Sequence, residues 1–173
     1  MKWSSKSILL AFILAAIGGT LLHFVYGWFP NPITMIFAPV NESIWEHLKL
    51  IYWPFLAAAL LLTRKGESGC RAPWLLSLLI ICAALLGVGY WFHILLQGDS
   101  MWFDIILYLV LMAAGFLLPR LFAPLAGKGW WSEALGVLVA LLGGAIVLFS
   151  FLPPDQILFV DLSAVRTWLT IPY

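Results

Sequence analysis

The stretch that organises the chain is residues 41–54, NESIWEHLKLIYWP. It brings two glutamates, a histidine and a lysine together at the start of an apolar segment. Charge is scarce elsewhere, because the 173 residues are 64% hydrophobic and only 10% charged. Ionisable groups beside a long apolar run are costly and therefore need a structural or functional reason. The sequence names no reaction, but this stretch marks a place where one could occur.

Composition predicts a membrane protein of the all-α class. The mean hydropathy is +1.04, and several apolar runs reach the ~20 residues that an α-helix needs to cross roughly 30 Å of hydrocarbon. The lipid bilayer is therefore an expected partner of the protein. Because lipid cannot form hydrogen bonds with the backbone, the spans are expected to be helices. The formal net charge is +1, and no basic face indicates nucleic-acid binding. Cys70 and Cys82 lack the spacing of a redox or metal motif.

The chain is expected to form one domain, a bundle of five transmembrane helices. They are placed at about residues 7–29, 43–62, 74–96, 101–118 and 132–152. The tight connection QGDS predicts that the third and fourth spans form an antiparallel hairpin. Two rows of small residues at four-residue spacing predict close helix packing. These rows are Ala11, Ala15 and Gly19 in the first span, and Gly136, Ala140 and Gly144 in the fifth.

Two segments outside the spans are expected to lie at the same end of the bundle. Residues 28–40 contain three prolines and should form a loop or a short re-entrant piece. Residues 153–173 are too short and too polar to cross the bilayer, and we expect them to lie in the extracytoplasmic interface, where they could act as a lid.

The basic residues predict the orientation, because loops rich in lysine and arginine stay in the cytoplasm. With the N-terminus inside and the C-terminus outside, seven of the nine basic residues are cytoplasmic. They are Lys2, Lys6, Arg64, Lys65, Arg71, Arg120 and Lys128. Only Lys49 and Arg166 are then outside. The expected location is the bacterial plasma membrane, crossed several times.

In this orientation all three histidines lie at the extracytoplasmic ends of the spans. His23 is near the end of the first span, His47 near the start of the second and His93 near the end of the third. Asp104 is one turn into the fourth span. An ionisable group below the headgroups costs roughly 2.5–3.5 kcal/mol, so groups from four helices at one depth are expected to face one another or a water-filled cavity.

The sharpest hypothesis is a zinc site. Three histidines with nearby carboxylates form the ligand set of a catalytic zinc ion, whose open position holds a water molecule. His23, His47 and His93 would be the ligands, Glu46 the general base, and Asp104 a fourth ligand or a residue that orients one. The reaction would be metal-assisted hydrolysis of a lipid-like substrate. No HExxH or HxxxH motif supports this hypothesis, and each histidine comes from a different helix.

A second interpretation is binding without a metal. A polar network of Asn41, Glu42, Lys49, Asp161 and Arg166 could hold a lipid headgroup or a small solute. Transport is less favoured, because five spans without an internal repeat lack the two-fold architecture common in transporters, although a homo-oligomer could supply it.

A third interpretation is purely structural. Ser43-x-x-Glu46 matches a capping box, and Asn41 is a good N-cap. Glu46 and Lys49 could form an ion pair on one helix, as part of a network that fixes helix register. Capping alone does not explain the three histidines or Asp104.

Several of these residues also carry a resemblance to a known family. They are His23 with Tyr26 and Trp28, the segment PVNESIWEHLKL at 39–50, Asp104, and FLPPDQILFVD at 151–161. Together they resemble a family of small bacterial membrane proteins, domain of unknown function 6512. The resemblance implies that the outer-face stretch and the Pro-Pro tail belong to the family pattern, and it carries no activity with it.

The tail departs from that pattern. The family pattern ends in a Tyr-Gly-Ile-like terminus, whereas this chain ends in residues 170–173, TIPY. A weaker likeness exists to intramembrane metal hydrolases of the alkaline ceramidase type, which gather histidine and aspartate from several helices near one face. Their paired-histidine motif is missing here.

Overall fold

The chain is almost entirely helical in the computed structural model, which describes residues 4–66, 68–127 and 129–164. The described residues form α1 (Ser5–Trp28), α2 (Pro32–Phe37), α3 (Leu48–Thr63), α4 (Ala72–Gly89), α5 (Met101–Leu117) and α6 (Gly129–Phe151). They also form the 3-10 turns η1 (Ser68–Arg71), η3 (Leu118–Arg120), η4 (Ala123–Gly127) and η5 (Ile157–Phe159), and the π-helical turn η2 (Tyr90–Leu95). No described residue is in a β-strand. The predicted all-α class is confirmed.

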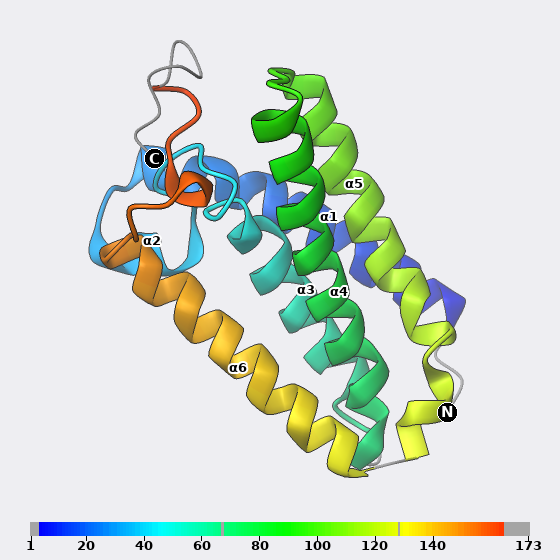
Figure 1. Ribbon diagram of the computed structural model, residues 1–173. Coiled ribbons are helices and arrows are strands. Elements are labelled where there is room, and N and C mark those ends of the chain that lie inside the picture. Colours follow the sequence, from blue (N-terminus) through cyan, green and yellow to red (C-terminus); the bar gives the residue numbers. More distant parts are fainter. Residues whose placement is uncertain (1–3, 67, 128, 165–173) are drawn as a thin grey trace.

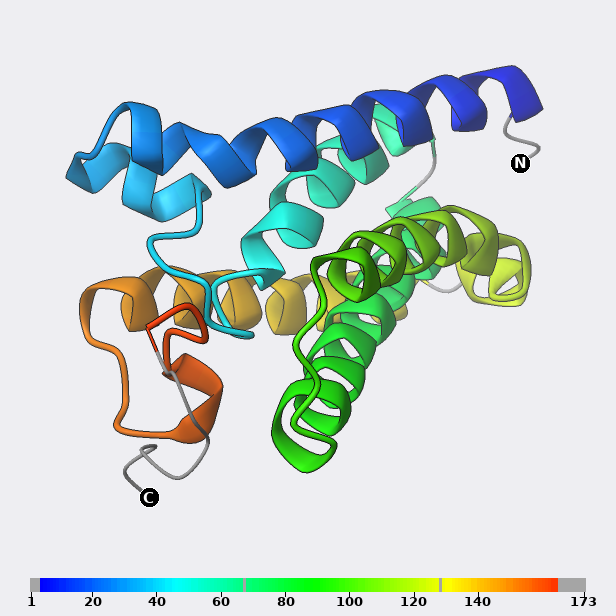
Figure 2. The same ribbon diagram turned by 90° about the horizontal axis from the view of Figure 1, so that it is seen from above.

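Helix α3 lies at the centre of the molecule. Helices α1 and α6 run along opposite sides of it, and the hairpin of α4 and α5 covers a third side (Figure 1, Figure 2). Leu48, Ile51 and Phe55 on α3 are fully buried, at the spacing of one helical face. The predicted antiparallel pairing of the segments on either side of QGDS is confirmed by the packing of α4 on α5.

Four helices, not five, are long and apolar enough to cross a membrane in the described part of the chain. They are Ser5–Trp28, Gly69–Leu95, Met101–Arg120 and Trp130–Phe151. The span expected at residues 43–62 is corrected to α3, whose 16 residues rise about 24 Å against the roughly 30 Å of hydrocarbon. Four helices of this length and composition indicate a membrane protein. The orientation of the chain in the membrane stays a prediction.

Helix α3 begins late because the residues before it form tight turns. Residues 44–47 are turns, and the backbone N–H groups of Leu48, Lys49 and Leu50 each bond to the carbonyl three residues earlier. This is the 3-10 pattern, which places side chains in different directions from those of an α-helix. The side chains of residues 42–47 therefore do not share the helical faces that the sequence predicts for them.

Helix α1 packs closely on α3 and α5 through its row of small residues. Ala15 and Gly19 are buried, and a Cβ at Gly19 would collide with the Leu50 carbonyl and the Tyr108 hydroxyl. Pro54 follows Leu50 by four residues and has no N–H to offer its carbonyl, so α1 approaches a carbonyl that the helix leaves unpaired. The second row of small residues, on α6, shows no such close packing at its glycines, because a Cβ at Gly136 or Gly144 would meet nothing within 4 Å.

The segment after α6 folds back onto residues 41–47. The Leu158 carbonyl accepts a hydrogen bond of 3.1 Å from the Trp45 backbone N–H. The Trp45 ring lies 5.0 Å from Phe159 and 5.5 Å from Phe149, between ring centroids. The end of the described chain thus covers the organising stretch, and residues 165–173 lie outside the described residues. Cys70 and Cys82 are buried and form no disulfide.

Candidate metal centre

The loop between α2 and α3 carries Glu42 and His47. Asn41 opens the turn, because its side-chain oxygen accepts a hydrogen bond of 3.0 Å from the Ser43 N–H. Ser43 then accepts one of 3.2 Å at Oγ from the Glu46 N–H. This is one half of the predicted capping box. The other half is replaced, since the Glu46 carboxylate accepts from the Val40 N–H at 2.8 Å.

Lys49 and Glu46 form a buried ion pair with a Nζ···Oε2 distance of 2.6 Å. The Lys49 ammonium is 0% exposed, and it also donates to the carbonyls of Met35 at 2.6 Å and Ala38 at 3.0 Å. The second Glu46 oxygen accepts from the Ser150 hydroxyl on α6 at 2.7 Å. Each Lys49 proton therefore has an acceptor and each Glu46 oxygen has a donor.

Lys49 caps α2 from a different helix. The last carbonyls of a helix lack internal donors, and Pro39 cannot donate to Met35. Lys49 satisfies that carbonyl, and Trp53 Nε1 donates to the next one, Ile36, at 3.0 Å. The geometry supports the structural interpretation for Glu46 and Lys49, and it leaves the Lys49 ammonium without access to a headgroup.

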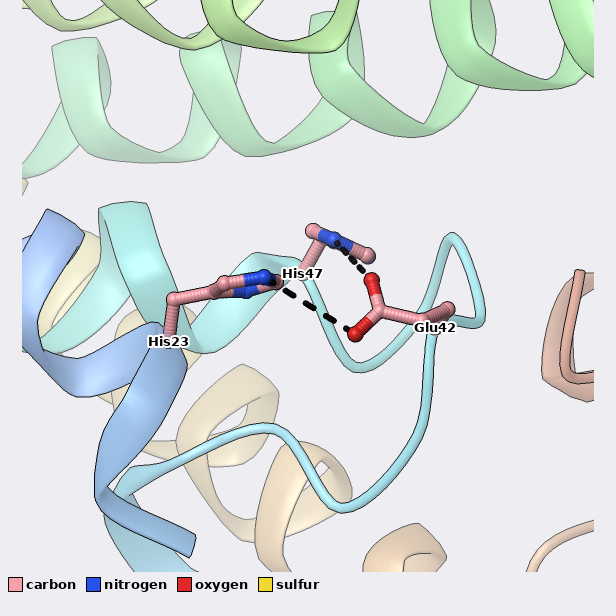
Figure 3. A group of neighbouring side chains, drawn as sticks. All are labelled: His23, Glu42 and His47. Atoms are coloured by element: carbon pink, nitrogen blue, oxygen red, sulfur yellow. Dashed lines mark ion pairs between the residues drawn. The ribbon is translucent and has the colours of Figure 1, made fainter. Parts of the chain in front are cut away.

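His23, Glu42 and His47 converge on one point (Figure 3). The two imidazoles approach the Glu42 carboxylate from α1 and from the start of α3, at 3.8 Å from His23 Nε2 to Oε1 and 3.3 Å from His47 Nε2 to Oε2. One ligand atom from each residue lies within 4.8 Å of the other two. Within the described residues, this is the only group of three or more His, Cys, Asp or Glu with that property.

The His47 ring is held in the orientation that a metal ligand needs. Its Nδ1 lies 2.8 Å from the Ser43 carbonyl, and because a carbonyl only accepts, Nδ1 must carry the proton. In the neutral ring, Nε2 then presents its lone pair toward Glu42. Metal-bound histidines commonly donate their other N–H to a carbonyl in this way. His23 has no such support, since its Nδ1 is buried without a hydrogen-bond partner among the described residues.

One of the observed distances equals that expected for a tetrahedral metal, and the other is longer. Two ligand atoms that each lie 2.0–2.1 Å from a tetrahedral zinc are about 3.3–3.4 Å apart. The distance of 3.3 Å from His47 Nε2 to Glu42 Oε2 matches. The distance of 3.8 Å from His23 Nε2 runs to the other oxygen, Oε1, so a single zinc would bind after a small movement of His23 or through both Glu42 oxygens. The three side chains are 26–45% exposed, so water can reach a fourth position. Two histidines and one glutamate are a known ligand set of catalytic zinc.

Without a metal, the same atoms favour an ion pair. The hydrogen bond from His47 lowers the pKa of the Glu42 carboxyl below its ordinary 4.5, against the opposing effect of burial. Burial alone would lower the pKa of His47. The Glu42 hydrogen bond, the Ser43 carbonyl and the charges of Glu42 and Asp104 outweigh it and raise that pKa above 6.5. A metal and a proton therefore compete for His47.

His93 is paired with Asp104 and lies outside the convergent group. It belongs to the π-helical turn η2, and its Nε2 is 2.7 Å from Asp104 Oδ1 while its Nδ1 is 3.0 Å from the Gly98 carbonyl. Both nitrogens face acceptors, so no lone pair is left for a metal. The loop that follows is tight, with Gln97 at φ 54°. Of the three histidines predicted as ligands, the structure brings only His23 and His47 together.

A family model described as a family of unknown function, DUF6512, matches residues 1–167. The chain belongs to this family. No curated protein and no solved structure matches it.

The other predicted site residues of this family member are dispersed. Asp161 accepts hydrogen bonds from the N–H and hydroxyl of Ser163, at 3.0 and 2.7 Å, within a local turn. Asn41 supports the turn before His47. Arg166 lies outside the described residues. The headgroup network therefore has Glu42 beside the histidines, Lys49 in the interior and Asp161 in the C-terminal segment.

Sequence reasoning placed Glu42 with the headgroup network and not among the metal ligands. The reason is the assumed α-helix, in which Glu42 shares a face with Glu46 and Lys49. The turn at 44–47 breaks that face and directs Glu42 toward His47 instead. A prediction of a tight turn at the polar residues 41–43 would have allowed Glu42 to pair with His47. No sequence signal links Ser150 to Glu46, because they are far apart in the chain.

Proposed function

We propose that this family member is an integral membrane protein that binds a divalent transition metal, most naturally zinc, through His23, Glu42 and His47. The observation that supports it best is the His47 ring, whose Nδ1 is fixed on the Ser43 carbonyl so that Nε2 faces the Glu42 carboxylate at 3.3 Å. His23 completes a two-histidine, one-carboxylate set with solvent access.

The reaction that fits such a site is hydrolysis. A bound zinc ion with three protein ligands lowers the pKa of a water molecule to about 7 and polarises a carbonyl or phosphoryl group. The protein residues then orient the substrate and move protons. Because the site lies at the end of apolar helices, we propose a lipid-like substrate.

The proton acceptor in this proposal is Asp104 and not Glu46. Both Glu46 oxygens are held inside the protein by Lys49, Val40 and Ser150. Asp104 is 45% exposed, its Oδ1 is fixed by His93, and its charge acts on His47. Glu46 retains a structural part in the same proposal.

Elemental analysis of the purified protein in detergent tests the metal site. We expect near-stoichiometric zinc in the wild type and a loss of at least about tenfold in affinity in His47→Ala and Glu42→Gln. His93→Gln is the matched control, because this histidine lies at the same end of the bundle outside the convergent group. A wild type without metal, or equal loss in His93→Gln, would contradict the proposal. A screen of ester and amide lipids with wild type and His47→Ala then tests hydrolysis.

We also propose that the N-terminus is cytoplasmic and the metal centre extracytoplasmic. In support, Arg64, Lys65, Arg71 and Arg120 are exposed near the end of α3, the start of α4 and the end of α5, away from the histidines. Labelling with a membrane-impermeant thiol reagent tests this in cells. Asp99→Cys should react and Lys65→Cys should not, and the reverse pattern would invert the topology.

A further inference from the structure

Helix α6 is joined to α3 and to the turn before it, but a groove remains between the two helices. Tyr52 on α3 donates a hydrogen bond of 2.7 Å to the Val139 carbonyl on α6, and Ser150 reaches Glu46 near the end of α6. The groove has two sections of about 620 and 730 Å³, and both are lined by Tyr52 and Ala140. The two sections therefore adjoin at these residues, with the Tyr52 side chain standing between them.

The groove exists because α6 presents small residues to it. Gly136, Ala140, Gly143 and Gly144 line it. A Cβ at Gly136 or Gly144 would meet nothing within 4 Å, so the space is not filled by the rest of the described chain. In a bilayer such an apolar groove must be covered, either by lipid or by protein.

One end of the groove is polar and the rest is apolar. Arg71, Ser132 and Glu133 line the 620 Å³ section where α4 and α6 begin. Val147, Leu148 and Phe151 line the far end of the other section. Arg71 and Glu133 are exposed, and neither forms an ion pair within the described residues. An apolar groove thus ends at two unpaired charges of opposite sign.

The dimensions fit one lipid chain. From residue 132 to residue 143 on α6 the rise is about 16 Å at 1.5 Å per residue, close to half of the roughly 30 Å hydrocarbon layer. A chain anchored at the polar end therefore extends along the 620 Å³ section as far as Tyr52, and the second section lies beyond that side chain.

We infer that this groove binds an acyl chain of a zwitterionic phospholipid, with the phosphate at Arg71 and the ammonium of a phosphoethanolamine headgroup at Glu133. Phosphatidylglycerol would also place its phosphate at Arg71, but it would offer Glu133 only neutral hydroxyl groups in place of an ammonium. A primary ammonium donates hydrogen bonds to a carboxylate, whereas a trimethylated one cannot. The lipid site is separate from the metal centre and does not depend on it.

Native mass spectrometry of the protein in detergent tests the lipid site, with phosphatidylethanolamine, phosphatidylcholine and phosphatidylglycerol added separately. We expect phosphatidylethanolamine to be retained best by the wild type. Arg71→Gln and Glu133→Gln should each lower its retention about five- to tenfold. Arg120→Gln is the matched control, an exposed arginine at the same end that lines neither section, and it should change nothing.

A second variant tests the groove itself. Ala140→Phe should fill the groove where its two sections meet and abolish retention of phosphatidylethanolamine, with an unchanged melting temperature because Ala140 is exposed. Equal retention of the three lipids by wild type and Arg71→Gln would overturn the headgroup assignment. A wild-type dimer that Ala140→Phe converts to monomer would show that a second copy covers the groove, and would overturn the lipid. His47→Ala should lose metal and keep lipid.

Discussion

Replacing Lys49 with methionine should destabilise the protein strongly. The substitution keeps an unbranched apolar stem but removes the ammonium that is 0% exposed. Glu46 then keeps a buried negative charge with only Val40 and Ser150 as donors. The Met35 and Ala38 carbonyls lose the donor that lies 2.6 and 3.0 Å away.

The size of the effect follows from these contacts. Breaking a buried ion pair by removing one partner costs about 3–5 kcal/mol. Each buried carbonyl left without a donor adds about 1 kcal/mol or more. The total is about 5–7 kcal/mol, which lowers the melting temperature by roughly 10–28 °C in a chain of this size.

Thermal unfolding in detergent, followed by tryptophan fluorescence and circular dichroism, measures this loss. Lys65→Met is the control, because that lysine is exposed at the end of α3. The double variant Glu46→Gln with Lys49→Met should recover part of the loss, since the orphaned charge is gone. A Lys49→Met melting temperature within about 2 °C of the control would refute the reasoning, because surface changes typically stay in that range.

Three further predictions follow from the packing and the site. Gly19→Ala should destabilise the protein by about 2 kcal/mol or more, because the added Cβ collides with the Leu50 carbonyl. Gly18→Ala is the control, because a Cβ there meets nothing within 4 Å. Equal melting temperatures of the two variants would count against the close approach of α1 to α3. Zinc affinity, measured by calorimetry between pH 8 and 6, should weaken as the pH falls through the raised pKa of His47. The loss should be about tenfold per pH unit for each proton displaced. An affinity that does not change with pH would exclude His47 as a ligand. Ser150→Ala should cost about 1–3 kcal/mol because a buried carboxylate oxygen loses its donor, and an unchanged melting temperature would show that water replaces it.

The four long helices could be predicted from the sequence, but α2, in a segment expected to be a loop or a short re-entrant piece, and the start of α3 could not. Apolar length alone placed α1, α4, α5 and α6, because a run of about 20 apolar residues has few alternatives to a membrane helix. The span that contains α3 was expected to begin at about Ser43. Local hydrogen bonds from Asn41 and Ser43 compete with the helical ladder there, and they move its start to Leu48.

The sequence predicted the end of the helices at which the candidate site lies. It predicted a different set of residues in contact there. Depth in the membrane follows from position along a span, so His23, His47 and His93 were expected together. Direction around a helix axis depends on packing, and η2 turns His93 toward Asp104. Glu46 was placed as a base, but its oxygens bond to Lys49 and Ser150, and the second of these contacts joins residues 104 positions apart.

The long-range contacts of residues 45 and 46 also set the order in which the protein can be completed during synthesis. Glu46 acquires the Ser150 donor only after α6 has been made. The Trp45 N–H bonds to the Leu158 carbonyl, which emerges from the ribosome later still. A nascent chain that stops before α6 therefore lacks one of the donors to the Glu46 carboxylate. Quality-control proteases in the membrane would meet such a chain in an incompletely folded state, so premature termination after α5 should yield a short-lived fragment.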